Sequence, residues 1–216
     1  IRHLWPIGRV LSPPAGGLTV SGRPVLNLSL AVNYAMGGTA VWGYHTFNLA
    51  VHILGSLTLL GIVRRTLLQP RLRERFGAGA LPLGLAVALL WALHPLQTES
   101  VTYVVQRAES LMGLFYLLTL YAFIRGAESS GRGWYVASVV ACVLGMGSKE
   151  VMVTAPLLVW LYDRTFVAGT FRGALRARWR LQALPPGCRW WNNPRRAKGR
   201  RWQTPLPSRA PCRRIR

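Results

Sequence analysis

The chain has 216 residues, of which 51% are hydrophobic and only 15% are charged, and its formal net charge is +21. Soluble domains carry about 25% charged residues, so this composition excludes an ordinary cytosolic enzyme, and the long apolar runs exclude a disordered basic protein. The three cysteines, Cys142, Cys188 and Cys212, are spaced too widely for a disulfide framework or a zinc site. The mean hydropathy of +0.24 agrees with the class that the runs predict, an integral membrane protein.

Residues 1–42 precede the first long apolar run, and we expect them to form an external loop. Within this loop, the segment that starts at Arg23 and Pro24 has apolar residues at positions 25, 26, 28, 30 and 32. This spacing predicts a short amphipathic helix that lies on the membrane surface.

Five uncharged runs follow, and a membrane span needs roughly 20 apolar residues. The first two runs are long enough by themselves, and the other three are long enough only if polar residues occupy their ends. The sequence therefore predicts an all-α fold, a polytopic transmembrane helical bundle over residues 43–180. An alternative for 133–162 is one long buried helix that is interrupted at 148–150. The five runs are 40–63, 76–98, 111–124, 133–148 and 151–162.

The loops between these runs differ in positive charge. Loops 64–80, 125–132 and 164–180 together hold 12 Arg or Lys, whereas the segments on the other side hold 5. Because cytoplasmic loops carry the excess of Arg and Lys, residues 1–42 are expected to face the periplasm or a lumen. No signal peptide precedes them, so we expect the chain to be a fragment that lacks an upstream span.

Polar residues enter the first span on the predicted outer side. His45, Asn48 and His52 share one helical face. They either hold neighbouring helices together by hydrogen bonds or, in the case of His45, contribute to a site at the interface. No third ligand follows at metal spacing, so we predict no metal site.

A second polar group follows Pro95, which ends the second predicted span. Glu99, Tyr103 and Arg107 are spaced four residues apart and would face the same way on one helix. In one interpretation Glu99 and Arg107 form a structural pair that braces an external helix. In the other they line a polar cleft at the membrane boundary, where ionisable groups are candidates for function because their burial is costly.

The third outer element interrupts apolar sequence with Lys149 and Glu150, which could simply neutralise each other. By topology alone, these residues meet the other polar groups on the outer side. We therefore predict Glu99 as the catalytic carboxylate. The predicted substrate-binding residues are Arg23, His45, His94, Arg107, Glu109, Lys149 and Glu150.

Three blocks of sequence, residues 23–52, 93–123 and 145–166, closely resemble a known family in the same order. They are similar to the membrane domain of bacterial tetratricopeptide-repeat glycosyltransferases and of the animal transmembrane-and-tetratricopeptide-repeat O-mannosyltransferases, in the GT-C superfamily. The resemblance implies a polyprenyl-phosphate sugar as donor, a protein as acceptor, and transfer on the periplasmic or luminal side of a membrane, expected to be the bacterial inner membrane. It also implies a catalytic acid before residue 1 and repeats after residue 216.

Transfer from such a donor develops negative charge on the leaving phosphate, which Arg or Lys can stabilise. Arg107 is the first candidate for this contact because arginine binds phosphate in a bidentate manner, and Lys149 is the second. Glu99 is the best base present. Because the resemblance places the catalytic acid upstream, we assign Glu99 to binding a hydroxyl of donor or acceptor and expect this chain to be inactive alone.

Three other functions are possible. A transporter would need charges along a path across the bilayer, whereas here the middles of the spans are apolar. A non-catalytic membrane anchor for a repeat domain remains an alternative. Nucleic-acid binding is the weakest, because 17 of the 27 basic residues are distributed among spans and loops.

Residues 182–216 differ in composition from the rest of the chain. They contain nine Arg, one Lys, six Pro, three Trp and two Cys, and no acid. The prolines exclude a long helix, and this combination is typical of GC-rich coding DNA read out of frame. We therefore expect residues 181–216 to be a disordered basic tail that arises from a frameshift.

Overall fold

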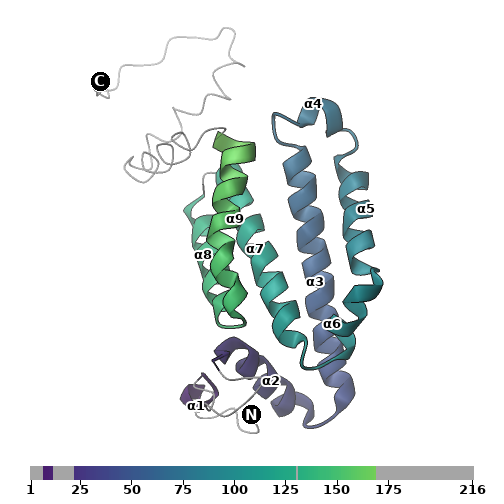
Figure 1. Cartoon of the computed structure of the whole chain (residues 1–216), viewed down its shortest axis with the longest axis vertical. Helices are drawn as coiled ribbons and strands as arrows, with labels where there is room; N and C mark the ends of the chain where they lie inside the picture. The colour runs from purple at the N-terminus through teal and green to yellow at the C-terminus, as the bar shows by residue number, and fades with distance from the viewer. Residues whose placement is uncertain (1–6, 12–21, 130, 169–216) are drawn as a thin grey trace, which may run out of the picture. The chain divides into compact units, whose positions relative to one another are not determined.

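The computed structural model describes residues 7–11, 22–129 and 131–168, and within these ranges it is all-α, without a strand (Figure 1). The fold class is thus confirmed, while the predicted tail lies outside the described residues. The elements in chain order are α1 (Ile7–Leu11), α2 (Pro24–Gly37), α3 (Val41–Leu67), α4 (Arg73–Phe76), α5 (Ala80–Ala92), the 3₁₀ helix η1 (Pro95–Gln97), α6 (Thr98–Thr102), α7 (Arg107–Ser129), α8 (Arg132–Met146), the 3₁₀ helix η2 (Glu150–Thr154), α9 (Ala155–Tyr162) and the π-helical turn η3 (Asp163–Ala168).

Two helices, α3 and α7, are long and apolar enough to cross a membrane. The 27 residues of α3 rise about 40 Å, more than the roughly 30 Å of hydrocarbon. Arg64 and Arg65 lie in its last turn, where positive charge complements the helix dipole. A third span is possible if Pro70–Phe76 and α5, which meet at a bend of 93°, count as one.

The expected count of five spans is therefore too high for the described residues. Helix α8 has 15 residues and rises about 22 Å, which is short of the hydrocarbon thickness. The last run is divided among η2, α9 and η3, and α9 itself has 8 residues. The alternative of one long helix over 133–162 with an interruption at 148–150 locates the break correctly. The two halves do not form one helix, however, because α8 ends at Met146 and the chain turns before Glu150 (Figure 1).

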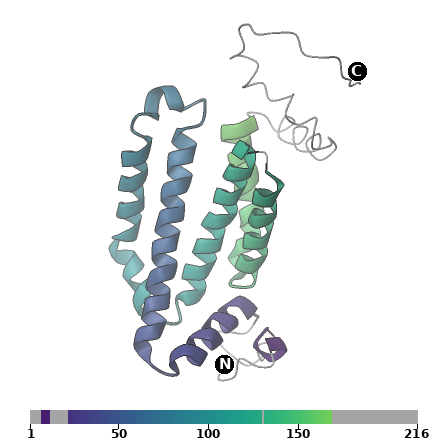
Figure 2. The same ribbon diagram turned by 180° about the vertical axis from the view of Figure 1, so that it is seen from behind.

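Helix α3 lies between α5 and α7, and α8 packs on α7 (Figures 1 and 2). Small residues allow these helices to approach closely, as in other membrane bundles. A Cβ atom on Gly61 of α3 would lie 2.7 Å from the ring of Tyr121 on α7, and one on Gly126 would lie 3.0 Å from the ring of Tyr135 on α8. The core between the helices includes Ile62, Leu120, Phe123, Ile124 and Tyr162.

The basic loops meet at one end of this helical body. Arg65 forms an ion pair with Glu128, and Arg71 Nη1 donates to the carbonyl of Thr165 at 2.6 Å. These contacts join the segments 64–80, 125–132 and the described start of 164–180. The expectation that these loops share a side is confirmed for the described residues, and 169–180 lie outside them.

The opposite end contains α2, α6 and the turn between α8 and η2. The expected helix after Arg23 is confirmed as α2, with Pro24 in its first turn, where proline is favoured. The amide of Val25 donates to the carbonyl of Gly147 at 3.1 Å, so α2 is attached to the α8–η2 turn. This end carries the residues that the sequence singled out.

Candidate functional site

Arg107, the first residue of α7, has a side chain that is 0% exposed. Its Nε donates to Asn48 Oδ1 at 2.8 Å, and its Nη1 donates to Asn33 Oδ1 at 2.6 Å. Nη2 donates to the carbonyl of Tyr44 at 3.0 Å, and Nη1 also approaches the carbonyl of Ser29 at 3.4 Å. One guanidinium thus connects α7 to both α2 and α3.

Aromatic rings enclose this guanidinium. Its central carbon lies 4.5 Å from the ring centre of Phe47 and 5.4 Å from that of Tyr44, within the range of cation–π attraction. Asn48 extends the network, because its Nδ2 lies 3.4 Å from each of the carbonyl oxygens of Val101 and Tyr103. We call the set Asn33, Tyr44, Phe47, Asn48 and Arg107 the arginine node.

The structure separates Glu99 from Arg107. The single helix expected over both residues is wrong, because α6 ends at Thr102 and the backbone at Tyr103 is extended, with φ −94° and ψ 120°. Glu99 lies on α6 and is exposed, whereas Arg107 is enclosed by amides, carbonyls and rings. Arg107 would have to leave the arginine node to bind a phosphate, which is costly for a buried charge that donates four hydrogen bonds.

Two ion pairs connect the α8–η2 turn to other elements at this end. Lys149 pairs with Glu109 of α7, and Glu150 lies 3.9 Å from Arg23 at the start of α2. The simple expectation that Lys149 and Glu150 neutralise each other is therefore wrong, because each has a partner on a different helix. The side chains of Arg23 and Lys149 are 28% and 21% exposed, so both cations are within reach of solvent.

The histidines contact backbone atoms. His45 Nδ1 lies 3.2 Å from the carbonyl oxygen of Val101, and His94 Nδ1 accepts a hydrogen bond from the amide of Leu96 at 3.3 Å. His52 Nε2 lies 3.0 Å from the carbonyl oxygen of Ala92. Asn48 and His52 thus hold neighbouring segments together by hydrogen bonds, which was the first of the two interpretations that the sequence allowed. Among the described residues, no group of three His, Cys, Asp or Glu could hold a metal ion.

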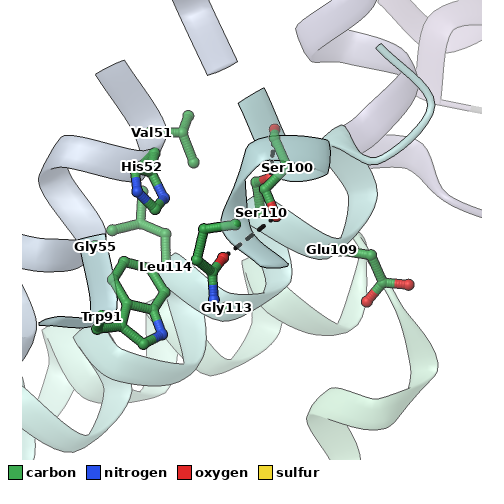
Figure 3. A pocket seen from close by; sticks show the side chains of 10 residues that line it. Val51, His52, Gly55, Trp91, Ser100, Glu109, Ser110, Gly113 and Leu114 are labelled. Atoms are coloured by element: carbon green, nitrogen blue, oxygen red, sulfur yellow. Dashed lines mark hydrogen bonds between the residues drawn. The ribbon is translucent and has the colours of Figure 1, made fainter. Parts of the chain in front are cut away.

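A cavity of about 150 Å³ lies beside the arginine node, between α3, α5, α6 and α7 (Figure 3). Glu109 is the one predicted site residue that lines this cavity. The sequence did not indicate the other lining residues as a site, because they come from four separate segments and none of them belongs to a recognisable motif. One signal was present, since each of two apolar helices carries a glycine here. A Cβ atom on Gly55 would contact the ring of Trp91 at 3.4 Å, and one on Gly113 would meet nothing within 4 Å. The lining residues are Val51, His52, Gly55, Trp91, Gln97, Ser100, Glu109, Ser110, Gly113 and Leu114.

Comparison with known proteins identifies relatives over about two thirds of the chain. It is 33% identical over 150 residues to Protein O-mannosyl-transferase tmtc2 of Xenopus laevis and 35% identical over 150 residues to Protein O-mannosyl-transferase Tmtc2 of Drosophila melanogaster. It is 30% identical over 172 residues to Protein O-mannosyl-transferase TMTC4 of Homo sapiens. These alignments cover 66%, 66% and 70% of this chain.

The same alignments cover 16%, 15% and 22% of the three relatives, so the chain spans about one fifth of their length or less. No protein-family model matches the chain. No solved structure matches it significantly. The resemblance to transmembrane O-mannosyltransferases that the three sequence blocks indicated is confirmed by these relatives.

Proposed function

We propose that this chain, a homologue of the transmembrane O-mannosyltransferases, is part of an integral membrane glycosyltransferase. The enzyme would move a sugar from a polyprenyl-phosphate donor to a hydroxyl group of a protein. The observation that carries the proposal is the similarity to relatives named protein O-mannosyl-transferase over about two thirds of this chain. Because these relatives are much longer, the activity belongs to the whole protein that contains the chain.

The distribution of charge supports a location for the reaction. Arg64, Arg65, Arg71, Arg73 and Arg75 lie at or near the end of α3 and in the following loop, and cytoplasmic loops are typically rich in arginine and lysine. We therefore place this end in the cytoplasm. The end with the arginine node then faces the periplasm or a lumen, and in a bacterium the membrane would be the inner membrane.

In the proposed reaction, the hydroxyl oxygen of the acceptor forms a bond to the anomeric carbon of the sugar. The bond between that carbon and the phosphate oxygen breaks, and the polyprenyl phosphate leaves with the electron pair. A carboxylate takes the proton of the hydroxyl. Cations near the leaving phosphate lower the barrier because they interact more strongly as its charge develops.

The geometry suggests how the described residues share these tasks. Arg23 and Lys149 are partly exposed cations at this end, so we assign the phosphate to them rather than to the enclosed Arg107. Glu99 is exposed on α6 and would bind a hydroxyl of donor or acceptor. His45 and His94 lie beside α6 and would complete the polar surface around the substrates.

The test is transfer of radiolabelled mannose from a short-chain polyprenyl phosphomannose to protein, measured with the full-length protein in detergent. Glu99→Gln should lower transfer by about tenfold or more, because a neutral amide binds a hydroxyl less strongly than a carboxylate does. Glu74→Gln, which changes an acid in α4 at the opposite end, is the matched control and should retain wild-type transfer. A wild-type protein that transfers no sugar would instead support the alternative of a non-catalytic membrane anchor.

A further inference from the structure

The cavity beside the arginine node combines an aromatic wall with polar groups. Trp91 of α5 stacks on His52 of α3, with ring centres 4.8 Å apart. Ser100 and Ser110 face them from α6 and α7, and Glu109 lies to one side (Figure 3). An aromatic surface next to several hydrogen-bonding groups is suited to a ligand with both C–H and O–H surfaces.

The size of the cavity limits this ligand to one small ring. Its volume is about 150 Å³, and an apolar protein cavity of about 150 Å³ accommodates a benzene ring. Pockets for drug-sized ligands are about 300 Å³ or larger. A single six-membered sugar ring is of the right size, whereas a nucleotide sugar is not.

The lining of the cavity suits a ligand that both donates and accepts hydrogen bonds. The side-chain amide of Gln97 and the indole N–H of Trp91 can donate, whereas the serine hydroxyls are left to accept. The hydroxyl of Ser110 donates to the carbonyl of Ser100 at 3.1 Å, and the hydroxyl of Ser100 donates to Gln97 Oε1 at 3.4 Å. His52 Nε2 must carry its hydrogen, because its partner, the carbonyl of Ala92, can only accept. These protein donors are occupied, so the two hydroxyl oxygens can offer the ligand only their lone pairs.

The nearby cations have other partners. Lys149 pairs with Glu109 at the edge of the cavity, and the guanidinium of Arg107 is held by the asparagines of the arginine node. A phosphate group is negatively charged and would lie beside the carboxylate of Glu109, which lines the cavity, so it fits this lining poorly. A sugar brings several hydroxyl donors and fits it well.

We propose that this cavity binds the sugar ring of the lipid-linked donor while the phosphate remains outside, near Lys149. The inference rests on the proposed function, because that function supplies the donor. It assigns sugar recognition to Gln97, Ser100 and Ser110, with Trp91 as the stacking surface. It also gives Lys149 a second task, which is to orient the carboxylate of Glu109 at the entrance.

Gly113 allows a direct test. It lines the cavity, and a Cβ atom at this position would meet nothing within 4 Å. The first carbon of a new side chain is therefore accommodated, and Gly113→Leu should extend the rest of its side chain into the cavity. Gly133 in α8 also has open space around it and lies outside the cavity, so Gly133→Leu is a matched control with the same change of side chain.

The experiment measures the dissociation constants of polyprenyl phosphomannose, of the same polyprenyl phosphate without sugar, and of methyl mannoside. It uses the full-length protein in lipid nanodiscs. Wild type and Gly133→Leu should bind the sugar-bearing lipid about tenfold more tightly than the bare lipid phosphate, as expected for one or two net hydrogen bonds. Gly113→Leu should lose this preference and retain its affinity for the lipid phosphate. Methyl mannoside binding that is lost in Gly113→Leu would show that the ring is recognised without the lipid.

Equal binding of the two lipids by wild type, or a preference that persists in Gly113→Leu, would overturn the proposal. If Gly113→Leu does not fold, Gly113→Ala serves instead and should reduce the preference by a smaller factor. Transfer activity is measured separately. If the wild type transfers sugar and Gly113→Leu still prefers the sugar-bearing lipid, the sugar pocket alone is rejected. If Gly113→Leu loses this preference but the wild type transfers no sugar, the proposed function alone is rejected.

Discussion

Replacement of Arg107 by methionine should destabilise the protein strongly. The change leaves Asn33 Oδ1 and Asn48 Oδ1 without the donor that each has now. The carbonyl of Tyr44, which Arg107 also contacts, lies within α3 and still accepts a bond from the helix backbone. An unpaired buried acceptor costs about 1–3 kcal/mol, which gives about 2–6 kcal/mol for the two asparagines. Buried charge networks broken at one partner typically lose about 3–5 kcal/mol, which lies within this range, so we expect a net loss of about 3–5 kcal/mol.

For a chain of this length, 1 kcal/mol shifts the unfolding midpoint by about 2–4 °C, so Arg107→Met should lower Tm by about 6–20 °C. The assay is thermal unfolding in detergent, followed by intrinsic tryptophan fluorescence. Arg65→Met is the control, because the ion pair of Arg65 with Glu128 is partly exposed and should contribute about 1 kcal/mol or less.

The control Arg65→Met should have a Tm within about 4 °C of the wild-type value. The same small change in the Tm of Arg107→Met would refute the reasoning. An unchanged Tm combined with loss of sugar transfer would show that Arg107 acts on the phosphate, and that the arginine node does not hold it in the working enzyme. A double-mutant cycle with Asn48→Ala adds a second criterion. The two changes should be less than additive, because each removes the same hydrogen bond.

The remaining predictions concern orientation and packing. In intact cells, a cysteine introduced at Gln97 should react with a membrane-impermeant thiol reagent and one at Pro70 should not, and the reverse pattern would invert the proposed orientation. Gly61→Ala should cost about 1–3 kcal/mol, because the new methyl group would lie 2.7 Å from the ring of Tyr121. Gly133→Ala, where space is open, should leave the unfolding midpoint unchanged or raise it slightly, and equal midpoints for the two variants would contradict the packing described.

The positions of the long helices could be predicted from hydropathy, but their ends could not. The uncharged run at 111–124 marks the middle of α7, yet the helix extends from Arg107 to Ser129. Charged residues ended the predicted run, whereas in the structure they continue the helix because partners on other segments hold them. Glu128, for example, pairs with Arg65 of α3.

The candidate site shows a similar limit. The sequence indicated correctly that Arg107, Glu109 and Lys149 lie at the same end of the bundle, because the order of spans determines this. It could not show that Arg107 meets Asn33 and Asn48, since these contacts join residues 74 and 59 positions apart. Because the helix breaks at Tyr103, Glu99 and Arg107 do not share the face that the sequence predicted. Nothing in the sequence indicated this break, since neither proline nor glycine occurs between α6 and α7.

The central claim is that the whole protein transfers a lipid-linked sugar to protein at the end of the bundle that carries the arginine node. The most direct measurement uses full-length protein reconstituted in sealed vesicles, with polyprenyl phosphomannose in the membrane and an acceptor protein on one side only. Labelled mannose should appear on acceptor placed at the side where Gln97 is accessible, and nucleotide-linked mannose should not replace the lipid-linked donor. Transfer only on the side of the basic loops, or from the nucleotide sugar alone, would contradict the account.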